Sequence, residues 1–280
     1  MSLKGVAKET LSILEAGQYV TSSDKIVSFL TEQRAAVVGT RLYTPEQAYA
    51  LLEEQAGCNS TSQPTIEVTD ETTQVAARRL VQVEECTDLV LLNYASARNP
   101  GGGFIRGAKA QEEDLARCSG LYPCLLTQPT YYEANRAQDS LLYTDHAIYS
   151  PKVPWFRTRS RELLERVFLA SVITAPAPNA GQALRRDPNA GPAIATALKR
   201  RAGIILAIAR ANGHRSLLLG AWGCGVFRNQ PAMVANVFGE WLAGTHFQGC
   251  FDRIVFAIYD SSHDKTTLRA FQQRFESDRQ

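Results

Sequence analysis

The chain has 280 residues, of which 45% are hydrophobic and 21% charged, a composition typical of a globular protein and not of a disordered or fibrous one. Its formal net charge of +2 is too small to predict nucleic-acid binding by phosphate neutralisation alone, because that mode needs a concentrated basic surface. The apolar stretches fall well short of the ~20 residues that cross a bilayer, so no membrane span is expected.

The first part of the chain is predicted to be helical. Apolar residues recur at helical spacing over residues 3–16, and a second helix is expected after Thr44-Pro45, where Thr44 suits a helix cap. The N-terminal residues lack the apolar core and cleavage site of a secretory signal, so a cytoplasmic location is expected. We therefore predict a helical extension over residues 1–60, packed on a main domain over residues 61–280.

The main domain alternates strand-type and helical patterns after a loop predicted at residues 57–64. Strands are predicted at residues 65–69, 89–92, 147–149, 170–173, 217–219 and 254–258. Helices are predicted at residues 72–81, 111–126, 192–211, 230–242 and 265–275. This order predicts an α/β fold with a mixed sheet sandwiched between helices, in which a ligand lies beyond the carboxyl ends of the strands.

Three other features are interpreted as structural. The basic run Lys199-Arg200-Arg201 is interpreted as a solvated helix face. The six cysteines form no C-x-x-C pair or Cys/His cluster, so reduced thiols are expected, with neither a metal site nor a disulfide framework. Residues 175–192, rich in Ala, Pro, Gly and Asn, are expected to be either a mobile flap or a surface loop.

The loop after residues 89–92 combines glycines with acidic residues. Residues 101–103 are three glycines, which let a sugar or phosphate approach the backbone, although such a run alone more often marks a tight turn after Asn99. The helix predicted from residue 111 then begins with two acidic side chains, Glu112 and Glu113. Because cleavage of a glycosidic bond uses a pair of carboxylates, the combination favours a glycosidase.

The two glutamates are expected to have different roles, since successive helix residues point about 100° apart. One can protonate the leaving oxygen, while the other accepts hydrogen bonds from ribose hydroxyls. A helix N-terminus lowers the pKa of a carboxyl group, whereas a general acid must be protonated near neutral pH. We expect a bound diphosphate, the neighbouring carboxylate and exclusion of water to raise that pKa again.

A second glycine-rich loop, residues 220–229, lies between a predicted strand and a predicted helix. Its glycines at 220, 223 and 225 allow backbone N–H groups to point at an anion, and a connection without ligand is the alternative. The spacing matches neither the dinucleotide-binding G-x-G-x-x-G nor the phosphate-binding G-x-x-x-x-G-K-[ST] pattern.

The three glycines followed by Gln111-Glu112-Glu113 resemble the signature of poly(ADP-ribose) glycohydrolases. Residues 7–17 and 68–73 are similar to the bacterial-type branch of that family. The resemblance implies a macrodomain fold with an added N-terminal helical region, and cleavage without a metal or an organic cofactor. It also implies that Glu113 is the catalytic acid and that Glu112 holds the ribose next to the scissile bond.

The resemblance further implies a set of substrate contacts. The second loop resembles the macrodomain diphosphate loop, and Phe227 is expected to pack on the ribose at the cleaved bond unless it is a core residue. Tyr259 follows the last strand, where macrodomains present a residue to adenine. The expected substrate-binding residues are Asn99, Gly101, Gly102, Gly103, Gln111, Gly220, Gly223, Cys224, Gly225, Val226, Phe227 and Tyr259.

The implied activity is hydrolysis of the ribose–ribose O-glycosidic bonds of poly(ADP-ribose), with release of ADP-ribose. The implied partners are this polymer or ADP-ribosylated proteins, bound by a monomer that has no sequence-specific nucleic-acid contact and serves the DNA damage response. Two alternatives are a non-catalytic reader of ADP-ribose and a hydrolase of mono(ADP-ribosyl) groups. Glu113 argues against the reader, because binding a diphosphate gains nothing from a nearby carboxylate.

Overall fold

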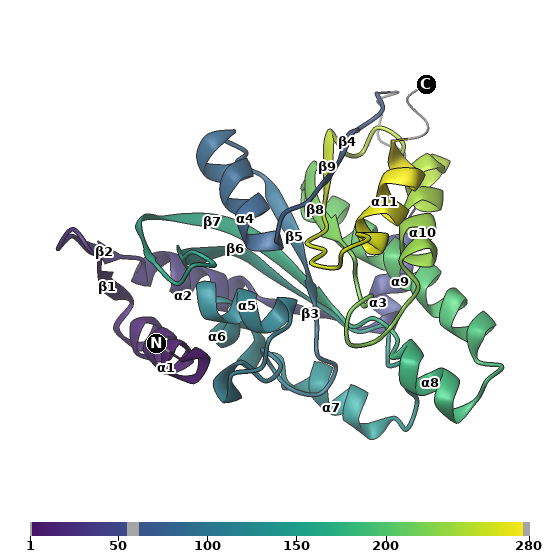
Figure 1. The fold of residues 1–280 in the computed structure, drawn as a ribbon, viewed down its shortest axis with the longest axis horizontal. Helices are drawn as coiled ribbons and strands as arrows, with labels where there is room; N and C mark the ends of the chain where they lie inside the picture. Colours follow the sequence, from purple (N-terminus) through teal and green to yellow (C-terminus); the bar gives the residue numbers. More distant parts are fainter. Residues whose placement is uncertain (1, 55–61, 277–280) are drawn as a thin grey trace.

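A computed structural model describes residues 2–54 and 62–276, in which helices cover both faces of a seven-stranded sheet (Figure 1). The strands of this sheet are β3 (Arg41–Tyr43), β4 (Thr65–Thr69), β5 (Leu89–Tyr94), β6 (Ala147–Arg157), β7 (Leu163–Ala175), β8 (Ser216–Gly220) and β9 (Arg253–Ala257). Their order is β3-β6-β7-β5-β8-β9-β4. Five neighbouring strands from β7 to β4 are parallel, whereas β6 pairs antiparallel with both β7 and β3. The predicted mixed α/β sheet is confirmed.

Two sets of helices form the outer layers of the molecule. One core packs the sheet against α3 (Pro45–Glu53), α8 (Ala180–Arg186), α9 (Gly191–Ala211), α10 (Pro231–Ala243) and α11 (Thr266–Phe275). The opposite face packs against α2 (Leu30–Gly39), α4 (Thr73–Arg78), α5 (Gln111–Cys118), α6 (Leu121–Leu126) and α7 (Pro129–Ala137).

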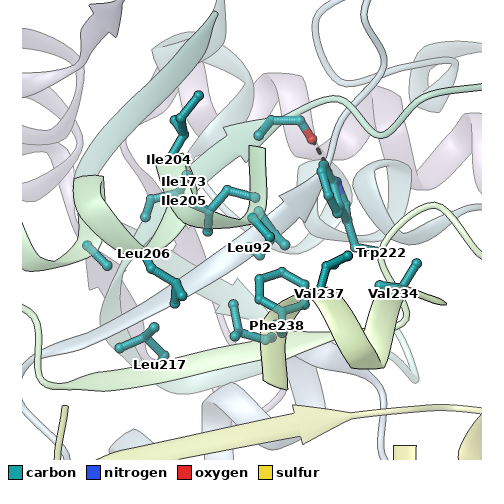
Figure 2. Close-up of a cluster of buried hydrophobic side chains, with 14 of the residues drawn as sticks. Leu92, Ile173, Ile204, Ile205, Leu206, Leu217, Trp222, Val234, Val237 and Phe238 are labelled. Atoms are coloured by element: carbon teal, nitrogen blue, oxygen red, sulfur yellow. Dashed lines mark hydrogen bonds between the residues drawn. The ribbon is translucent and has the colours of Figure 1, made fainter. Parts of the chain in front are cut away.

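Strand β5 shows how the sequence specifies this layering. Val90 and Leu92 belong to one core, while Leu89 and Leu91 belong to the other, because successive strand side chains point to opposite faces. A strand buried on both faces therefore has a continuous apolar run. Figure 2 shows Leu92 in the first core, beside Ile173, Phe238 and Trp222.

The N-terminal residues provide helices, a hairpin and an edge strand of the main sheet. The predicted helix α1 (Leu3–Ala16) ends at Gly17, whose φ of 64° suits glycine, and α3 begins with a capping box between Thr44 and Gln47. The short strands β1 (Gln18–Val20) and β2 (Ile26–Ser28) pair with each other, and neither they nor α2 and β3 were predicted. The division at residue 60 stays a prediction.

The helix predicted over residues 111–126 is wrong in its length, because the chain leaves the helix at Ser119-Gly120. Gly120 N donates to Pro154 O at 2.8 Å, and Ser119 pairs with Trp155 of β6 as an isolated bridge. A Cβ at Gly120 would lie 1.7 Å from Gln33 Oε1, so the close approach of α2 requires glycine there. The result is two short helices, α5 and α6, instead of one.

Other elements differ from the prediction in extent. Strands β6 and β7 form a hairpin much longer than the short apolar runs that predicted them, and register shifts interrupt it. Helix α4 continues into a π-helical turn at Arg79–Val83. Helix α8 occupies part of residues 175–192, which were expected to be a flap or loop. Of the loop predicted at residues 57–64, positions 57–61 lie outside the described residues.

Two structural interpretations need correction. Arg201 is not on a solvated helix face, because its side chain is fully buried and paired with Asp145. The helical pattern of the sequence does not reveal this distant partner. Cys86, Cys118, Cys124 and Cys224 are free thiols as expected, but Cys250 is disulfide-bonded, since sequence spacing does not reveal which thiols the fold brings together. Among the described residues, no helix has the length and apolar character needed to span a membrane.

Candidate active site

A cleft of about 1240 Å³ lies where the carboxyl ends of four parallel strands meet. Its walls include Thr72 after β4, Ser96 after β5, Gly223 after β8 and Tyr259 after β9. Ligands of open α/β sheets bind at this edge, because the strand-to-helix loops gather there. Both glycine-rich loops singled out in the sequence contribute to the cleft.

The first loop brings the glycines and Glu113 into direct contact. Gly103 N donates to Glu113 Oε1 at 2.8 Å, and Glu113 Oε2 is buried without a hydrogen-bond partner among the described residues. Gly102 has a φ of 59°, and a Cβ there would lie 2.3 Å from Glu113 Oε1 and 3.2 Å from Glu112 Oε2. Glycine is therefore required at this position both by its backbone conformation and by the two carboxylates.

Glu112 is held more firmly than Glu113. Its Oε1 accepts from Asn93 Nδ2 at 3.2 Å, and its Oε2 accepts from Ser96 N at 2.6 Å. Both donors belong to the end of β5 and the loop that follows it, so the strand fixes the carboxylate of the helix. The side chain is 3% exposed, which removes it almost completely from water.

Burial raises the pKa of Glu112 to about 8, because water no longer solvates the charged form. The charge of Glu113 acts in the same direction, while the hydrogen bonds from Ser96 and Asn93 lower the pKa. Glu112 therefore retains a proton near neutral pH. At this carboxyl group desolvation outweighs the effect of the helix dipole, which would lower the pKa.

Gln111 lines the cleft, but its side chain is occupied by contacts within the protein. Its Oε1 accepts from Tyr94 N at 2.8 Å, and its Nε2 donates to Leu92 O at 2.8 Å and to Thr73 Oγ1 at 3.1 Å. These three bonds join the start of α5 to the end of β5 and to α4. Gln111 therefore positions the two glutamates that follow it.

The second loop presents free backbone donors. Gly223, with a φ of 73°, accepts from Asn229 N and Nδ2 through its carbonyl, and these bonds close the turn. The amide nitrogens of Gly225, Val226 and Phe227 have no acceptor within the part of the chain that the structure describes. Successive unpaired N–H groups before a helix are suited to binding an anion, so this geometry favours a phosphate site.

The other predicted contact residues differ in their positions. Asn99, Cys224, Val226, Phe227 and Tyr259 all line the cleft, with Val226 and Tyr259 largely exposed. Burial raises the pKa of Cys224 to about 12, so it is a neutral thiol.

Two glycines are less directly involved than the rest of the predicted set. Gly220, at the end of β8, does not line the cleft. A Cβ there would lie 2.0 Å from Tyr94 Oη, so glycine is needed at this position for packing. Gly101, which is buried, packs on Phe104 and Tyr122 behind the loop.

The cleft also contains a group of cationic side chains that the sequence patterns did not predict. Arg117 of α5, Arg157 at the end of β6, and Arg159 and Arg161 in the turn after it all line the cleft. Arg159 stacks over the ring of Tyr259, with its Cζ 4.0 Å from the ring centroid. No sequence signal marks them, because the long hairpin that carries them was predicted only as two short apolar runs. Among the described residues, no group of three or more His, Cys, Asp or Glu is arranged to hold a metal ion.

A glycine-lined cleft with free amide donors and two buried carboxylates, at the carboxyl edge of a mixed sheet, defines the class of α/β glycosidases that act on phosphorylated sugars. The description "microbial-type PARG, catalytic domain", where PARG is poly(ADP-ribose) glycohydrolase, matches residues 7–158. A comparison with curated proteins gave no match.

Solved structures extend this similarity over the whole chain. The enzyme of Thermomonospora curvata is 45% identical, with a TM-score of 0.92 over 98% of this chain and 99% of the other. The same enzyme bound to the inhibitor ADP-HPD has a TM-score of 0.89 at the same identity and coverage. The enzyme of Deinococcus radiodurans in complex with ADP-ribose is 47% identical, with a TM-score of 0.81 over 88% of this chain and 97% of the other.

The chain therefore belongs to the bacterial poly(ADP-ribose) glycohydrolases, enzymes of the macrodomain superfamily that hydrolyse the glycosidic bonds of poly(ADP-ribose). The family predicted from the glycine run and Gln111-Glu112-Glu113 is confirmed, and so is its enzymatic class.

Proposed function

We propose that Glu113 is the general acid and base of poly(ADP-ribose) hydrolysis in this cleft. The observation that carries the proposal is the difference between the two glutamates. Both oxygens of Glu112 accept hydrogen bonds from β5 and its loop, whereas Glu113 Oε2 has no partner among the described residues. A carboxyl oxygen that makes no hydrogen bond to the protein is free to approach the leaving oxygen of a substrate and to deliver a proton to it.

The proposed reaction has two proton transfers. Glu113 first protonates the ribose oxygen that leaves, as the bond from the anomeric carbon to that oxygen breaks through an oxocarbenium-like transition state. The deprotonated Glu113 then removes a proton from a water molecule as it attacks the anomeric carbon. The products are free ADP-ribose and a polymer that is one ADP-ribose unit shorter, and Glu113 has regained its proton.

Glu112 is proposed to orient the ribose next to the scissile bond. With a pKa raised to about 8, its carboxyl group can donate one hydrogen bond to a ribose hydroxyl and accept another. Its rigid contacts with Asn93 and Ser96 fix the distance from β5 to the sugar. Such positioning is worth a large factor in rate, because the reacting atoms must be aligned before proton transfer.

The remainder of the ligand is proposed to lie along the two glycine loops. The free amides of Gly225, Val226 and Phe227 would hold the diphosphate, Phe227 and Asn99 would contact the reacting ribose, and Tyr259 would face the adenine. Binding of ADP-ribose by the Deinococcus radiodurans enzyme supports this assignment.

The test compares the wild-type protein with Glu113→Gln and Glu112→Gln. We expect Glu113→Gln to release ADP-ribose from the polymer at least ~100-fold more slowly while its affinity for ADP-ribose stays within about twofold, because the amide keeps the shape but carries no acidic proton. Glu112→Gln should weaken ribose binding as well as slow the reaction. If only Glu112→Gln is inactive, the two roles are reversed.

The same assay separates the two alternative activities. A reader would bind ADP-ribose and leave both the polymer and mono(ADP-ribosyl) proteins intact. A mono(ADP-ribosyl) hydrolase would release ADP-ribose from a singly modified protein but not from the polymer. Either result contradicts the proposal.

We further propose that the protein acts as a cytoplasmic monomer in the DNA damage response, without sequence-specific contacts to nucleic acid. The small net charge of +2 supports the part of this proposal that concerns nucleic acid, because sequence-independent phosphate binding needs a concentrated basic surface. Light scattering coupled to gel filtration would contradict the monomer if it gave a mass of two chains.

A further inference from the structure

We propose that Tyr143 is a positioning residue for the substrate, because it packs on Phe227 from outside the cleft and fixes where the Phe227 ring meets the reacting ribose. Tyr143 lies in the segment that leads into β6, and it does not line the cleft itself. The inference rests on the proposed function and deepens it, since it concerns how the same cleft holds the sugar at the cleaved bond.

The ring of Phe227 touches both the cleft and the protein behind it. Phe227 lines the cleft and packs against the first core, and its ring centroid lies 5.9 Å from that of Tyr143 at an interplanar angle of 44°. Aromatic rings attract each other in such tilted arrangements when their centroids are about 4.5–7 Å apart. Tyr143 therefore limits how far the Phe227 ring can withdraw from the cleft.

The backbone of Phe227 is held by other contacts than its ring. Its carbonyl accepts from Gly181 N at 2.9 Å, and the turn before it is closed by the bonds from Asn229 to Gly223 O. Loss of the Tyr143 ring should thus leave the backbone amides of the loop, which are proposed to hold the diphosphate, in place. The two functions of Phe227, amide donor and ring, can be separated by experiment.

Tyr143 has an unusual backbone conformation for an aromatic residue. Its φ of 61° lies in the left-handed region, where residues other than glycine are uncommon. Such conformations persist only where the surrounding structure holds them, and they cluster at functional sites. Here Tyr143 N donates to Ser140 O at 3.4 Å, and Tyr143 O accepts from Arg201 Nη2 at 3.4 Å. The direction of the Tyr143 ring is thus set by its backbone.

The buried Arg201 connects this segment to the second glycine loop. Its Nη2 donates to Leu142 O at 3.0 Å, and its Nη1 donates to Pro176 O at 2.5 Å in the segment between β7 and α8. The same segment accepts from the loop, because Asn229 Nδ2 donates to Pro178 O at 2.8 Å. One guanidinium group therefore holds both parts of the chain in a fixed relation, so the aromatic contact between them is rigid.

The test compares Tyr143→Ala, which removes the ring, with Tyr143→Phe, which removes only the hydroxyl. The Tyr143 hydroxyl makes no hydrogen bond within residues 2–54 and 62–276, so the phenylalanine variant is the matched control. Calorimetric titration gives the Kd of two ligands, ADP-ribose and ADP. ADP contains the diphosphate and the adenosine but lacks the ribose that Phe227 is proposed to contact.

We expect Tyr143→Ala to raise the Kd of ADP-ribose about tenfold, while the Kd of ADP stays within about twofold of the wild-type value. Tyr143→Phe should leave both constants within about twofold. Should Tyr143→Ala fail to fold, Tyr143→Gly gives the same comparison, because glycine accepts a positive φ.

Three results would overturn the inference. An unchanged Kd of ADP-ribose would mean that Phe227 keeps its position without Tyr143. An equal rise for ADP and ADP-ribose would mean that the substitution loosens the whole cleft. An equal loss in Tyr143→Phe would mean that the hydroxyl and not the ring is required.

A double-mutant cycle tests whether Tyr143 acts through Phe227. We expect Phe227→Ala/Tyr143→Ala to bind ADP-ribose within about twofold of Phe227→Ala alone, since the ring that Tyr143 supports is already absent. Independent effects, in which the two losses multiply, would contradict this route.

The outcome can be told apart from a failure of the proposed function. Activity retained by Glu113→Gln would refute the proposed acid and leave these binding constants valid. An unchanged Kd of ADP-ribose in Phe227→Ala would refute the proposed contact of Phe227 with the ribose. A loss in Phe227→Ala without a loss in Tyr143→Ala would keep that contact and refute only the role of Tyr143.

Discussion

Adjacent glutamates at the start of α5 are given different properties by their hydrogen bonds. Glu112 receives donors from Asn93 and Ser96 and is almost fully buried, while Glu113 receives only Gly103 N. In the proposed mechanism, one of these two glutamates holds the sugar and the other reacts with it. The contrast depends on Gly102, which leaves room for both carboxylates.

Gly102→Ala should disrupt the site with little effect on the rest of the protein. The new Cβ would lie 2.3 Å from Glu113 Oε1, and the φ of 59° is unfavourable for alanine. Because Glu113 must move, we expect kcat to fall at least ~100-fold. Steady-state kinetics check this, with Gly191→Ala as the control, since no atom lies within 4 Å of a Cβ there. Equal activity of both variants would contradict the geometry.

The raised pKa of Glu112 predicts a loss of stability with rising pH. The unfolded chain releases this proton near pH 4.5, whereas the folded protein keeps it until about pH 8. Between these values the folded state binds more protons, so the free energy of unfolding falls by up to about 1.4 kcal/mol per pH unit. Denaturant unfolding of the wild type should show this fall, and Glu112→Gln should remove it.

The control for that experiment is Glu133→Gln, which replaces an exposed glutamate of α7. Its unfolding free energy should follow that of the wild type at every pH. If Glu112→Gln also does so between pH 5 and pH 8, burial does not keep Glu112 protonated.

At the level of elements, Asp145 joins three parts of the fold. Its Oδ1 accepts from Arg201 Nε at 3.0 Å and its Oδ2 from Arg200 Nε at 2.6 Å, both on α9, and Tyr49 Oη of α3 also donates to it. Arg201 additionally donates to Leu142 O and Pro176 O. This cluster connects α9 with the segments that lead into β6 and out of β7.

Asp145→Ala should destabilise the protein by about 3–5 kcal/mol, because it leaves the buried Arg201 without its counter-ion. Urea unfolding measures this loss. Glu240→Ala breaks the exposed pair with Lys199 on α10 and α9 and should cost no more than about 1 kcal/mol. Similar losses in the two variants would mean that the buried pair has no special role.

Sequence patterns predicted the elements whose signals are local. The apolar run of β5, the cap of α3 at Thr44 and the long helix α9 all depend on neighbouring residues, and each was predicted. The break at Gly120 and the burial of Arg201 depend on Gln33 and Asp145, which are distant in the sequence. The same distinction separates the glycine loops, which were predicted, from the cleft residues Arg157, Arg159 and Arg161, which were not.

For the whole molecule, the topology of the sheet explains why the site lies where it does. Four parallel strands, β4, β5, β8 and β9, end at one edge, so four loops from distant parts of the chain line one cleft. The antiparallel hairpin β6–β7 also contributes arginines to the lining of the cleft. Catalytic and binding residues can thus be supplied by separate elements of a rigid sheet.

In the proposed mechanism, Glu113 meets the glycosidic oxygen of a polymer held in this cleft. A crystal structure of the Glu113→Gln protein with a bound ADP-ribose oligomer tests it most directly. We expect the carboxamide of residue 113 within about 3–3.5 Å of the bridging ribose oxygen, and the pyrophosphate of that unit on the amides of Gly225, Val226 and Phe227. An oligomer bound with its glycosidic oxygen beyond reach of residue 113, with no water between them, would contradict the account.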